Sequence, residues 1–167
     1  LLAVGSVEEA RRHILQALKL EPLNSEALAL QTIMAIVQND KGRALEIAFE
    51  NVRSNPESAT AHIALSHALQ AHFDLNGALQ SLQVAVGKDP QNALAWARLA
   101  EVLSSLARLD DALEAARKAS RLSPHLSRTQ TVLGYAFLNR VQVEAARQAF
   151  LEAVSLDQAD PLPRLGL

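Results

Sequence analysis

Residues 93–126 read ALAWARLAEVLSSLARLDDALEAARKASRLSPHL, and this stretch decides the fold. Its apolar residues recur at i, i+3, i+4 and i+7, the spacing that places side chains on one face of an α-helix. These residues are Leu99, Val102, Leu103 and Leu106. Pro124, near the end of the stretch, cannot continue a helix. The stretch therefore predicts amphipathic helices that end before a proline.

The same pattern recurs along the chain with a fixed period of 34 residues. Prolines stand at Pro22, Pro56, Pro90 and Pro124, and Gln158 occupies the next equivalent position. The alanines that precede each of these positions by twelve residues are Ala10, Ala44, Ala78, Ala112 and Ala146. The residues that precede them by five are Ala17, Asn51, Ala85, Ala119 and Ala153. Three coincident periodic positions indicate a true internal repeat.

This repeat resembles the tetratricopeptide repeat (TPR), a 34-residue pair of antiparallel helices with small residues at positions 8, 20 and 27 and Pro at 32. We call the two helices of each pair the A helix and the B helix. The resemblance implies an all-α fold, a right-handed superhelix in which the small residues let helices approach closely. It covers the whole chain as one solenoid, 1–167, with a partial repeat at 1–24, full repeats at 25–58, 59–92, 93–126 and 127–160, and the start of another at 161–167. The expected helices are 7–21, 25–38, 41–54, 59–72, 75–88, 93–106, 109–122, 127–140 and 143–156.

The repeat at 25–58 departs most from the pattern. Gln31 replaces a leucine at position 7, Lys41 replaces a bulky residue at position 17, and Asn51 replaces the small residue at position 27. We expect this repeat to be the most loosely packed. A buried polar group needs a partner, so we expect Asn51 to hydrogen-bond to the loop between repeats.

Composition excludes several classes of function. The 167 residues carry a net charge of −2, no cysteine, and no apolar run near the ~20 residues that a membrane span requires. We therefore expect neither nucleic-acid binding nor membrane insertion. The three histidines His62, His67 and His72 are spaced by five, which turns them about 140° apart on a helix. No metal site, cofactor motif or catalytic constellation is expected, and the chain is predicted not to be an enzyme.

The single methionine is Met34, so we expect the sequence to be a piece of a longer protein. The composition, rich in alanine and leucine and without cysteine, is typical of bacterial proteins. The compartment stays open between cytoplasm and periplasm.

In the TPR family, positions 2, 5, 9, 12 and 13 of the A helices line a groove that contacts peptide ligands. Carried onto this sequence, the candidate groove residues are Ala29, Ile33, Ile36, Val37, Ile63, His67, Gln70, Ala97, Glu101, Thr131, Tyr135, Leu138 and Asn139. The same positions also hold Glu26, Thr60, Ala71, Leu94, Ser104, Ser105 and Arg128. A lysine-based carboxylate clamp is excluded because no predicted A helix contains lysine, and an asparagine ladder is excluded because only Asn139 is available.

The predicted function is that of a protein-interaction scaffold that binds a peptide or partner protein in this groove. We expect apolar ligand side chains near Ile33 and Ile63, with Tyr135 and Glu101 fixing the ligand's orientation. An equally weighted alternative is that Ile33, Ile36 and Val37 only pack beneath a preceding A helix.

Two other functions stay open. Weak self-association could proceed through apolar residues at the ends of the chain, namely Leu1, Leu2, Val4, Leu162, Leu165 and Leu167. Alternatively, the chain could be the recruiting arm of a larger enzyme whose catalytic domain lies outside this sequence.

Overall fold

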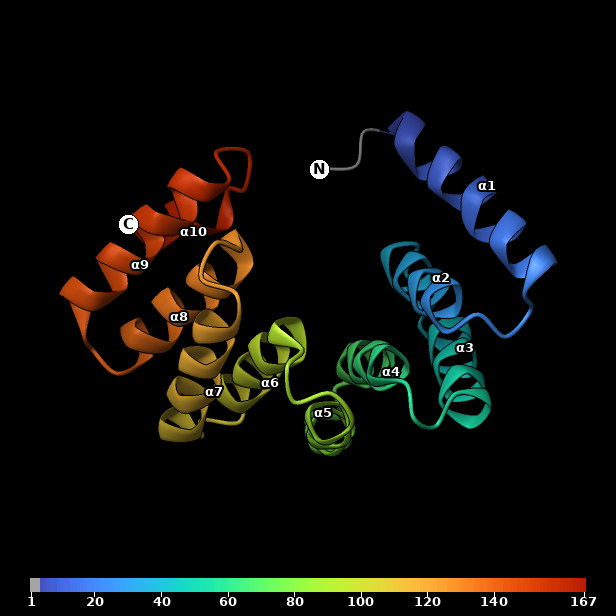
Figure 1. Ribbon diagram of the computed structural model, residues 1–167, viewed down its shortest axis with the longest axis horizontal. Helices are drawn as coiled ribbons and strands as arrows, with labels where there is room; N and C mark the ends of the chain where they lie inside the picture. Colours follow the sequence, from blue (N-terminus) through green and yellow to red (C-terminus); the bar gives the residue numbers. More distant parts are fainter. Residues whose placement is uncertain (1–3) are drawn as a thin grey trace. The chain divides into compact units, whose positions relative to one another are not determined.

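The computed structural model describes residues 4–167, with side chains from residue 8 onward, and every regular element in that part of the chain is a helix (Figure 1). The helices are α1 Val4–Leu20, α2 Ser25–Val37, α3 Lys41–Ser54, α4 Ala59–Ala71, α5 Leu75–Lys88, α6 Ala93–Ser105, α7 Leu109–Leu122, α8 Ser127–Asn139, α9 Val143–Leu156 and α10 Leu162–Leu165. The predicted all-α fold is confirmed. From residue 25 onward each predicted helix agrees with the observed one to within one residue, whereas α1 begins at Val4 instead of residue 7.

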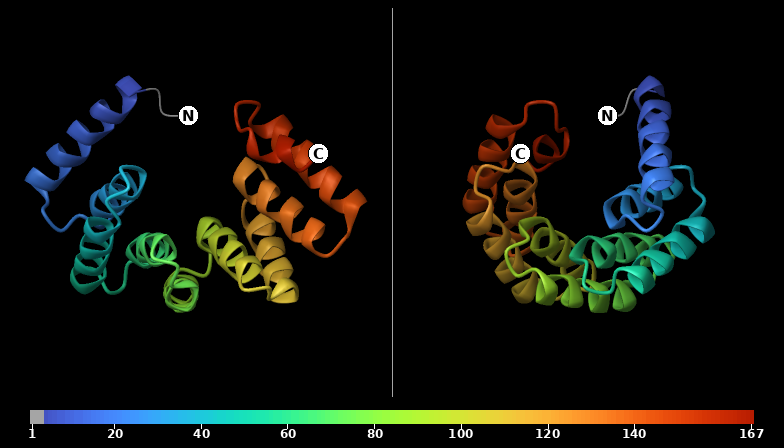
Figure 2. Two further views of the ribbon diagram at one scale, coloured as in Figure 1. Left: turned by 180° about the vertical axis from the view of Figure 1, so that it is seen from behind. Right: turned by 45° about the vertical axis from the view of Figure 1, so that its right-hand side comes forward.

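The chain divides into two compact units, the first ending at Lys88 and the second running from Asp89 to Leu167. In the first unit each helix packs against the next, and α2 also packs against α4. In the second unit α6 pairs with α7 and α8 with α9, and α6 also packs against α8. The short α10 contacts both α8 and α9 (Figure 2). The proposed repeat boundaries and a single solenoid over 1–167 stay predictions.

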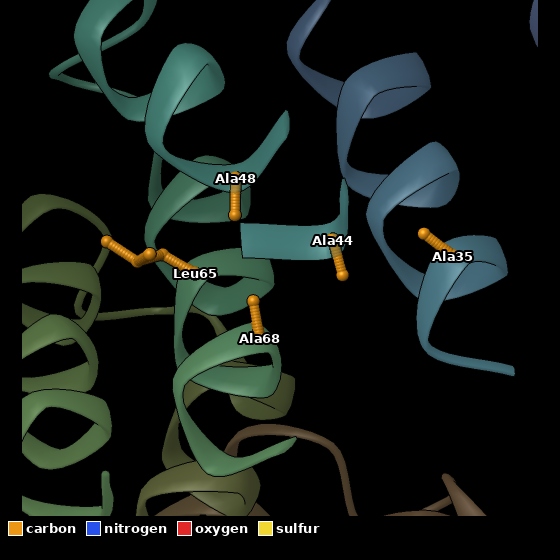
Figure 3. Close-up of a cluster of buried hydrophobic side chains, with 5 residues drawn as sticks. All are labelled: Ala35, Ala44, Ala48, Leu65 and Ala68. Carbon is orange, nitrogen blue, oxygen red and sulfur yellow. The ribbon is translucent and has the colours of Figure 1, made fainter. Parts of the chain in front are cut away.

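From α3 onward the recurring alanines are buried at helix crossings, whereas Ala10 and Ala17 of α1 are only partly buried. Ala44 and Ala78 are 0% exposed, Ala112 is 1% exposed and Ala146 is 2% exposed, as the pattern predicts. Ala85, Ala119 and Ala153 are also fully buried. Figure 3 shows one such cluster, in which Ala35, Ala44, Ala48, Leu65 and Ala68 bring α2, α3 and α4 together. Because alanine adds almost no width, the helix backbones come close enough for the remaining side chains to interlock.

The polar residue in this pattern, Asn51, is satisfied by hydrogen bonds. Its Nδ2 donates to the carbonyl oxygen of Ser25 at 2.9 Å, and its Oδ1 accepts from Nδ2 of Asn55 at 3.0 Å. This confirms the prediction that Asn51 bonds to the junction between repeats. The last repeat has a hydrogen bond between the equivalent two positions, but with donor and acceptor exchanged: the hydroxyl of Ser127 donates to the carbonyl oxygen of Ala153 at 3.0 Å.

Position 4 of the repeat has a bonding role that the sequence did not reveal. In three repeats a side-chain nitrogen at this position donates to the carbonyl oxygen of the proline six residues earlier. The pairs are His62 Nε2 to Pro56 at 3.1 Å, Trp96 Nε1 to Pro90 at 2.9 Å and Gln130 Nε2 to Pro124 at 2.8 Å. Three different donors therefore satisfy the carbonyl of a proline that lies beyond the end of the preceding helix.

Each A helix from α2 to α8 is followed by a residue with left-handed backbone conformation. The four residues, 34 positions apart, are Asn39, Phe73, Ala107 and Val141, with φ between 58° and 63°. After α8, the amide of Gln142 donates to the carbonyl oxygen of Phe137 and that of Val141 to Leu138, both at 2.9 Å. These two bonds form a Schellman motif, which turns the chain sharply into the following B helix.

Because a β-branched residue is strained at φ 59°, we expect Val141→Gly to increase the free energy of unfolding by roughly 0.5–1 kcal/mol. Val141 is 80% exposed, so its side chain contributes little packing. Urea denaturation would measure the change. The matched control is Val84→Gly. Because Val84 lies inside α5, this substitution should lower the free energy of unfolding by about 1 kcal/mol. Equal losses in both variants would contradict strain at Val141.

Phe150 on α9 fills the space that smaller residues occupy in other repeats. It is fully buried between Gly134 of α8 and Gly166, which follows α10. A Cβ atom on Gly134 would lie 2.5 Å from Cε1 of the ring, and one on Gly166 would also collide with it. Both glycines are therefore required by close approach to one aromatic ring rather than by a turn.

We expect Gly134→Ala to lower the free energy of unfolding by about 1–3 kcal/mol, because the buried ring of Phe150 has no room to move away. Thermal denaturation followed by circular dichroism would measure the loss. Gly42→Ala in the first turn of α3 serves as the control, because a Cβ there meets no atom within 4 Å. That control should not lower the melting temperature, and a loss of the same size in both variants would exclude the steric explanation.

Candidate functional site

The structure distributes the candidate groove residues over four A helices. In the first unit, Ala29, Ile33, Ile36 and Val37 lie on α2, and Ile63, His67 and Gln70 lie on α4. In the second unit, Ala97 and Glu101 lie on α6, and Thr131, Tyr135, Leu138 and Asn139 lie on α8. Ala29 and Ala97 are 8% and 2% exposed, so their side chains offer a ligand almost no surface.

The apolar residues of the first unit divide between packing and exposure. Ile36 packs against the alanine cluster of α2, α3 and α4, which does not include a preceding A helix, whereas Val37 is 69% exposed. A cavity of about 140 Å³ lies between α1, α2 and α3, and Gln31 forms part of its lining. That the repeat at 25–58 is the most loosely packed stays a prediction.

The second unit contains a cavity of about 240 Å³ between α6, α8 and α10, which we call the α6–α8 cavity. Its lining residues are Glu101, Ser104, Arg128, Thr131, Val132, Tyr135, Asn139 and Leu162. The structure thus brings together Glu101, Thr131, Tyr135 and Asn139 from the candidate groove residues. Ser104 and Arg128 also occupy groove positions, whereas Val132 and Leu162 do not and were missed.

Tyr135 lines the cavity, and its hydroxyl is already hydrogen-bonded within the protein. Its hydroxyl donates to the carbonyl oxygen of Leu162 at 2.8 Å, which ties α8 to α10. Its ring meets Phe150 edge-on, with 4.9 Å between ring centroids and 71° between planes. The ring is therefore held in place from behind, and its hydroxyl is engaged within the protein.

Glu101 pairs with two arginines, of which Arg128 also lines the cavity. Arg98 donates from Nη1 to Oε2 of Glu101 at 3.0 Å, and Arg128 donates from Nη2 to Oε1. The Arg98 side chain is 9% exposed, that of Glu101 25% and that of Arg128 42%. Burial lowers the pKa of Arg98, the hydrogen bond and charge of Glu101 oppose this shift, and the charge of Arg128 adds to it. Glu101 therefore holds the arginines, and Arg128 is the charged group that reaches solvent.

A sequence signal for this network exists at position 6 of the repeat. The residues there are Leu30, Ala64, Arg98 and Val132. Among them Arg98 is the one charged residue, at a position that is otherwise apolar. A charge in that place needs a partner within reach, and Glu101 one helical turn later supplies it.

Comparison with known families identifies the chain. Two overlapping matches to a tetratricopeptide repeat model cover residues 63–127 and 99–161, more than half of the sequence together. The chain belongs to the tetratricopeptide repeat family. No curated protein shows significant similarity to the chain in sequence.

Solved TPR structures share the fold of this chain. The MamA structure is 25% identical over 92% of this chain and 90% of its own, with a TM-score of 0.67. A thermophilic TPR protein from Thermus thermophilus is 21% identical over 97% of this chain and 89% of its own, with a TM-score of 0.84. YrrB is 19% identical over 97% of this chain and 85% of its own, with a TM-score of 0.66.

The remaining predictions concern membrane spans, metal ligands and self-association. Within residues 4–167, no helix is long and apolar enough to cross a membrane, and no group of three or more potential metal ligands is found among the described side chains. His72, like His62, donates to a backbone carbonyl, that of Lys41 at 2.9 Å. Self-association stays a prediction: Leu1, Leu2 and the Val4 side chain lie outside what the structure describes, and Leu165 and Leu167 are exposed.

We expect Glu101→Gln to lower the free energy of unfolding by about 1–3 kcal/mol, because it removes the negative charge that the two neighbouring guanidinium groups share. Urea denaturation would measure this change. In an Arg98→Met background the buried charge is gone, so Glu101→Gln should cost clearly less. An undiminished cost in that background would show that Arg98 and Glu101 are not coupled.

Proposed function

We propose that this TPR protein binds a partner protein through a peptide segment that contacts the α6–α8 cavity and the neighbouring faces of the A helices. TPR domains are protein-interaction scaffolds, and this chain has the fold and the repeat positions of that family. The cavity is the observation that carries the proposal, because it gathers predicted groove residues from α6 and α8 at one place.

The chemistry of the cavity favours a peptide side chain over a small-molecule substrate or cofactor. At about 240 Å³ it is smaller than most sites for small molecules, which measure roughly 300–1,000 Å³. Its accessible lining is mostly apolar, with polar groups at the rim. Such a site accepts one apolar side chain and fixes the backbone around it through a few polar contacts.

The related structures give independent support. YrrB is described as a TPR protein with an unusual peptide-binding site. It shares the fold of this chain at 19% identity, so it supports the general mode of binding and not a particular ligand. In the first unit, the apolar surface near Ile33 and Ile63 is a separate candidate contact for a partner, and Val37 is 69% exposed there.

We expect Ser104→Phe to weaken peptide binding at least tenfold, because the new ring would fill the α6–α8 cavity from its lining. Ser104 is partly exposed, so the fold should tolerate the change. The measurement is selection of a displayed random peptide library on the wild-type protein, followed by titration of the best binders against each variant.

Ser155→Phe is the matched control, since Ser155 is exposed on α9 and does not line the cavity. It should bind as the wild type does. Ile33→Asp tests the first unit in the same titration. Undiminished binding to Ser104→Phe would remove the α6–α8 cavity from consideration, and undiminished binding to Ile33→Asp would remove the first unit's apolar surface.

A further inference from the structure

Three charged residues beside the α6–α8 cavity form a network with a net positive charge, in which Glu101 and Arg128 line the cavity and the buried Arg98 does not. Arg98 and Arg128 contribute two positive charges, and Glu101 between them contributes one negative charge. Burial at Arg98 strengthens electrostatic interactions there, because less water screens them. A ligand that brings a carboxylate to this network would balance the remaining charge.

Arg128 is the group placed to receive that carboxylate. Among the described residues its guanidinium donates to Glu101 alone, through Nη2, which leaves the other N–H groups of its side chain available. A guanidinium offers its donors in a flat fork that matches the two oxygens of a carboxylate. Since Glu101 is itself fixed by the buried Arg98, the Arg128 side chain is oriented before any ligand arrives.

The interior of the same cavity takes an apolar group. Val132, the Tyr135 ring and Leu162 form much of its wall. A dry apolar cavity of about 150 Å³ is already large enough to admit benzene. The cavity here is larger, at about 240 Å³, so a leucine, methionine or phenylalanine side chain fits its size.

We propose that the α6–α8 cavity binds an extended segment of a partner protein in which an apolar side chain and an acidic side chain lie two residues apart. In an extended chain, residues i and i+2 point to the same side, about 6.6–6.8 Å apart. The apolar side chain fills the cavity, and the carboxylate of Asp or Glu pairs with Arg128 at the rim. A side-chain carboxylate suits this half-exposed position because it keeps part of its hydration. This inference rests on the proposed function and adds the class of ligand to it.

The test is an array of end-blocked peptides with a central X-Gly-Z triplet in a Gly–Ser frame, in which X and Z are varied over all amino acids. Wild-type protein should prefer an apolar residue at one position and Asp or Glu at the other. Replacing the acid by Asn or Gln should weaken binding about three- to tenfold. High salt should reduce this difference, because the rim is partly exposed to solvent.

Variants at two arginines separate the role of Arg128 from general charge. Arg128→Gln should bind acidic and amide peptides equally while keeping the preference for an apolar side chain. Arg128→Lys keeps the charge without the planar fork, so it should retain part of the acidic preference. Arg140→Gln is the matched control, because Arg140 is 41% exposed and pairs with Asp110 outside the cavity. It should behave as the wild type.

Three results would overturn the inference. They are no preference for acid in the wild type, an acidic preference that persists in Arg128→Gln, and a requirement for a free C-terminal carboxylate in an unblocked set of peptides. If peptides selected from the random library bind and Ser104→Phe abolishes their binding, the proposed function stands even when acidic residues prove irrelevant. If Ser104→Phe leaves that binding unchanged, both proposals fail.

Discussion

The close approach of helices at alanine is the constraint on which the rest of this structure depends. Ala44, Ala78, Ala112 and Ala146 are buried on B helices, where larger side chains would separate the members of each pair. No single pair could bury its apolar face alone, so each gains stability from its neighbours. Because the contacts repeat with the sequence, a fold of many helices needs only one local rule. Stability is then nearly a sum of local interfaces, and one overfilled crossing weakens its own neighbourhood first.

Periodicity made most of the fold predictable. Helix boundaries from residue 25 onward followed from the 34-residue repeat, because small residues, apolar spacing and prolines all mark the same positions. The bonding of Asn51 also followed, since a buried amide in a tight crossing must find a partner. The left-handed turns at Phe73 and Val141 did not follow. Neither residue favours that conformation, and it is imposed by the helix hairpin closing around it.

The site was predictable only in part. Repeat position predicted groove residues on α6 and α8, and three of them, Tyr135, Glu101 and Asn139, do line one cavity. Whether a groove position is open depends on the volume of side chains far away in sequence, and a helical pattern does not contain that information. Leu162, which is not a groove position, closes one wall of the cavity from α10. Ala97, which the sequence predicted to face the groove, is 2% exposed and does not line the cavity. The role of Glu101 also changed, because its oxygens are engaged by Arg98 and Arg128.

The departures from the repeat in the second unit depend on one another. Phe150 replaces a smaller residue and therefore requires Gly134 and Gly166, and the ring so placed supports Tyr135 as a wall of the cavity. Arg98 replaces an apolar residue and therefore requires Glu101, which in turn orients Arg128 at the rim. Each exception is costly alone and tolerated only with its partners. Residues that obey the repeat maintain the scaffold, and the coupled exceptions shape one cavity, so a specific function is best sought where the repeat is broken in a coordinated way.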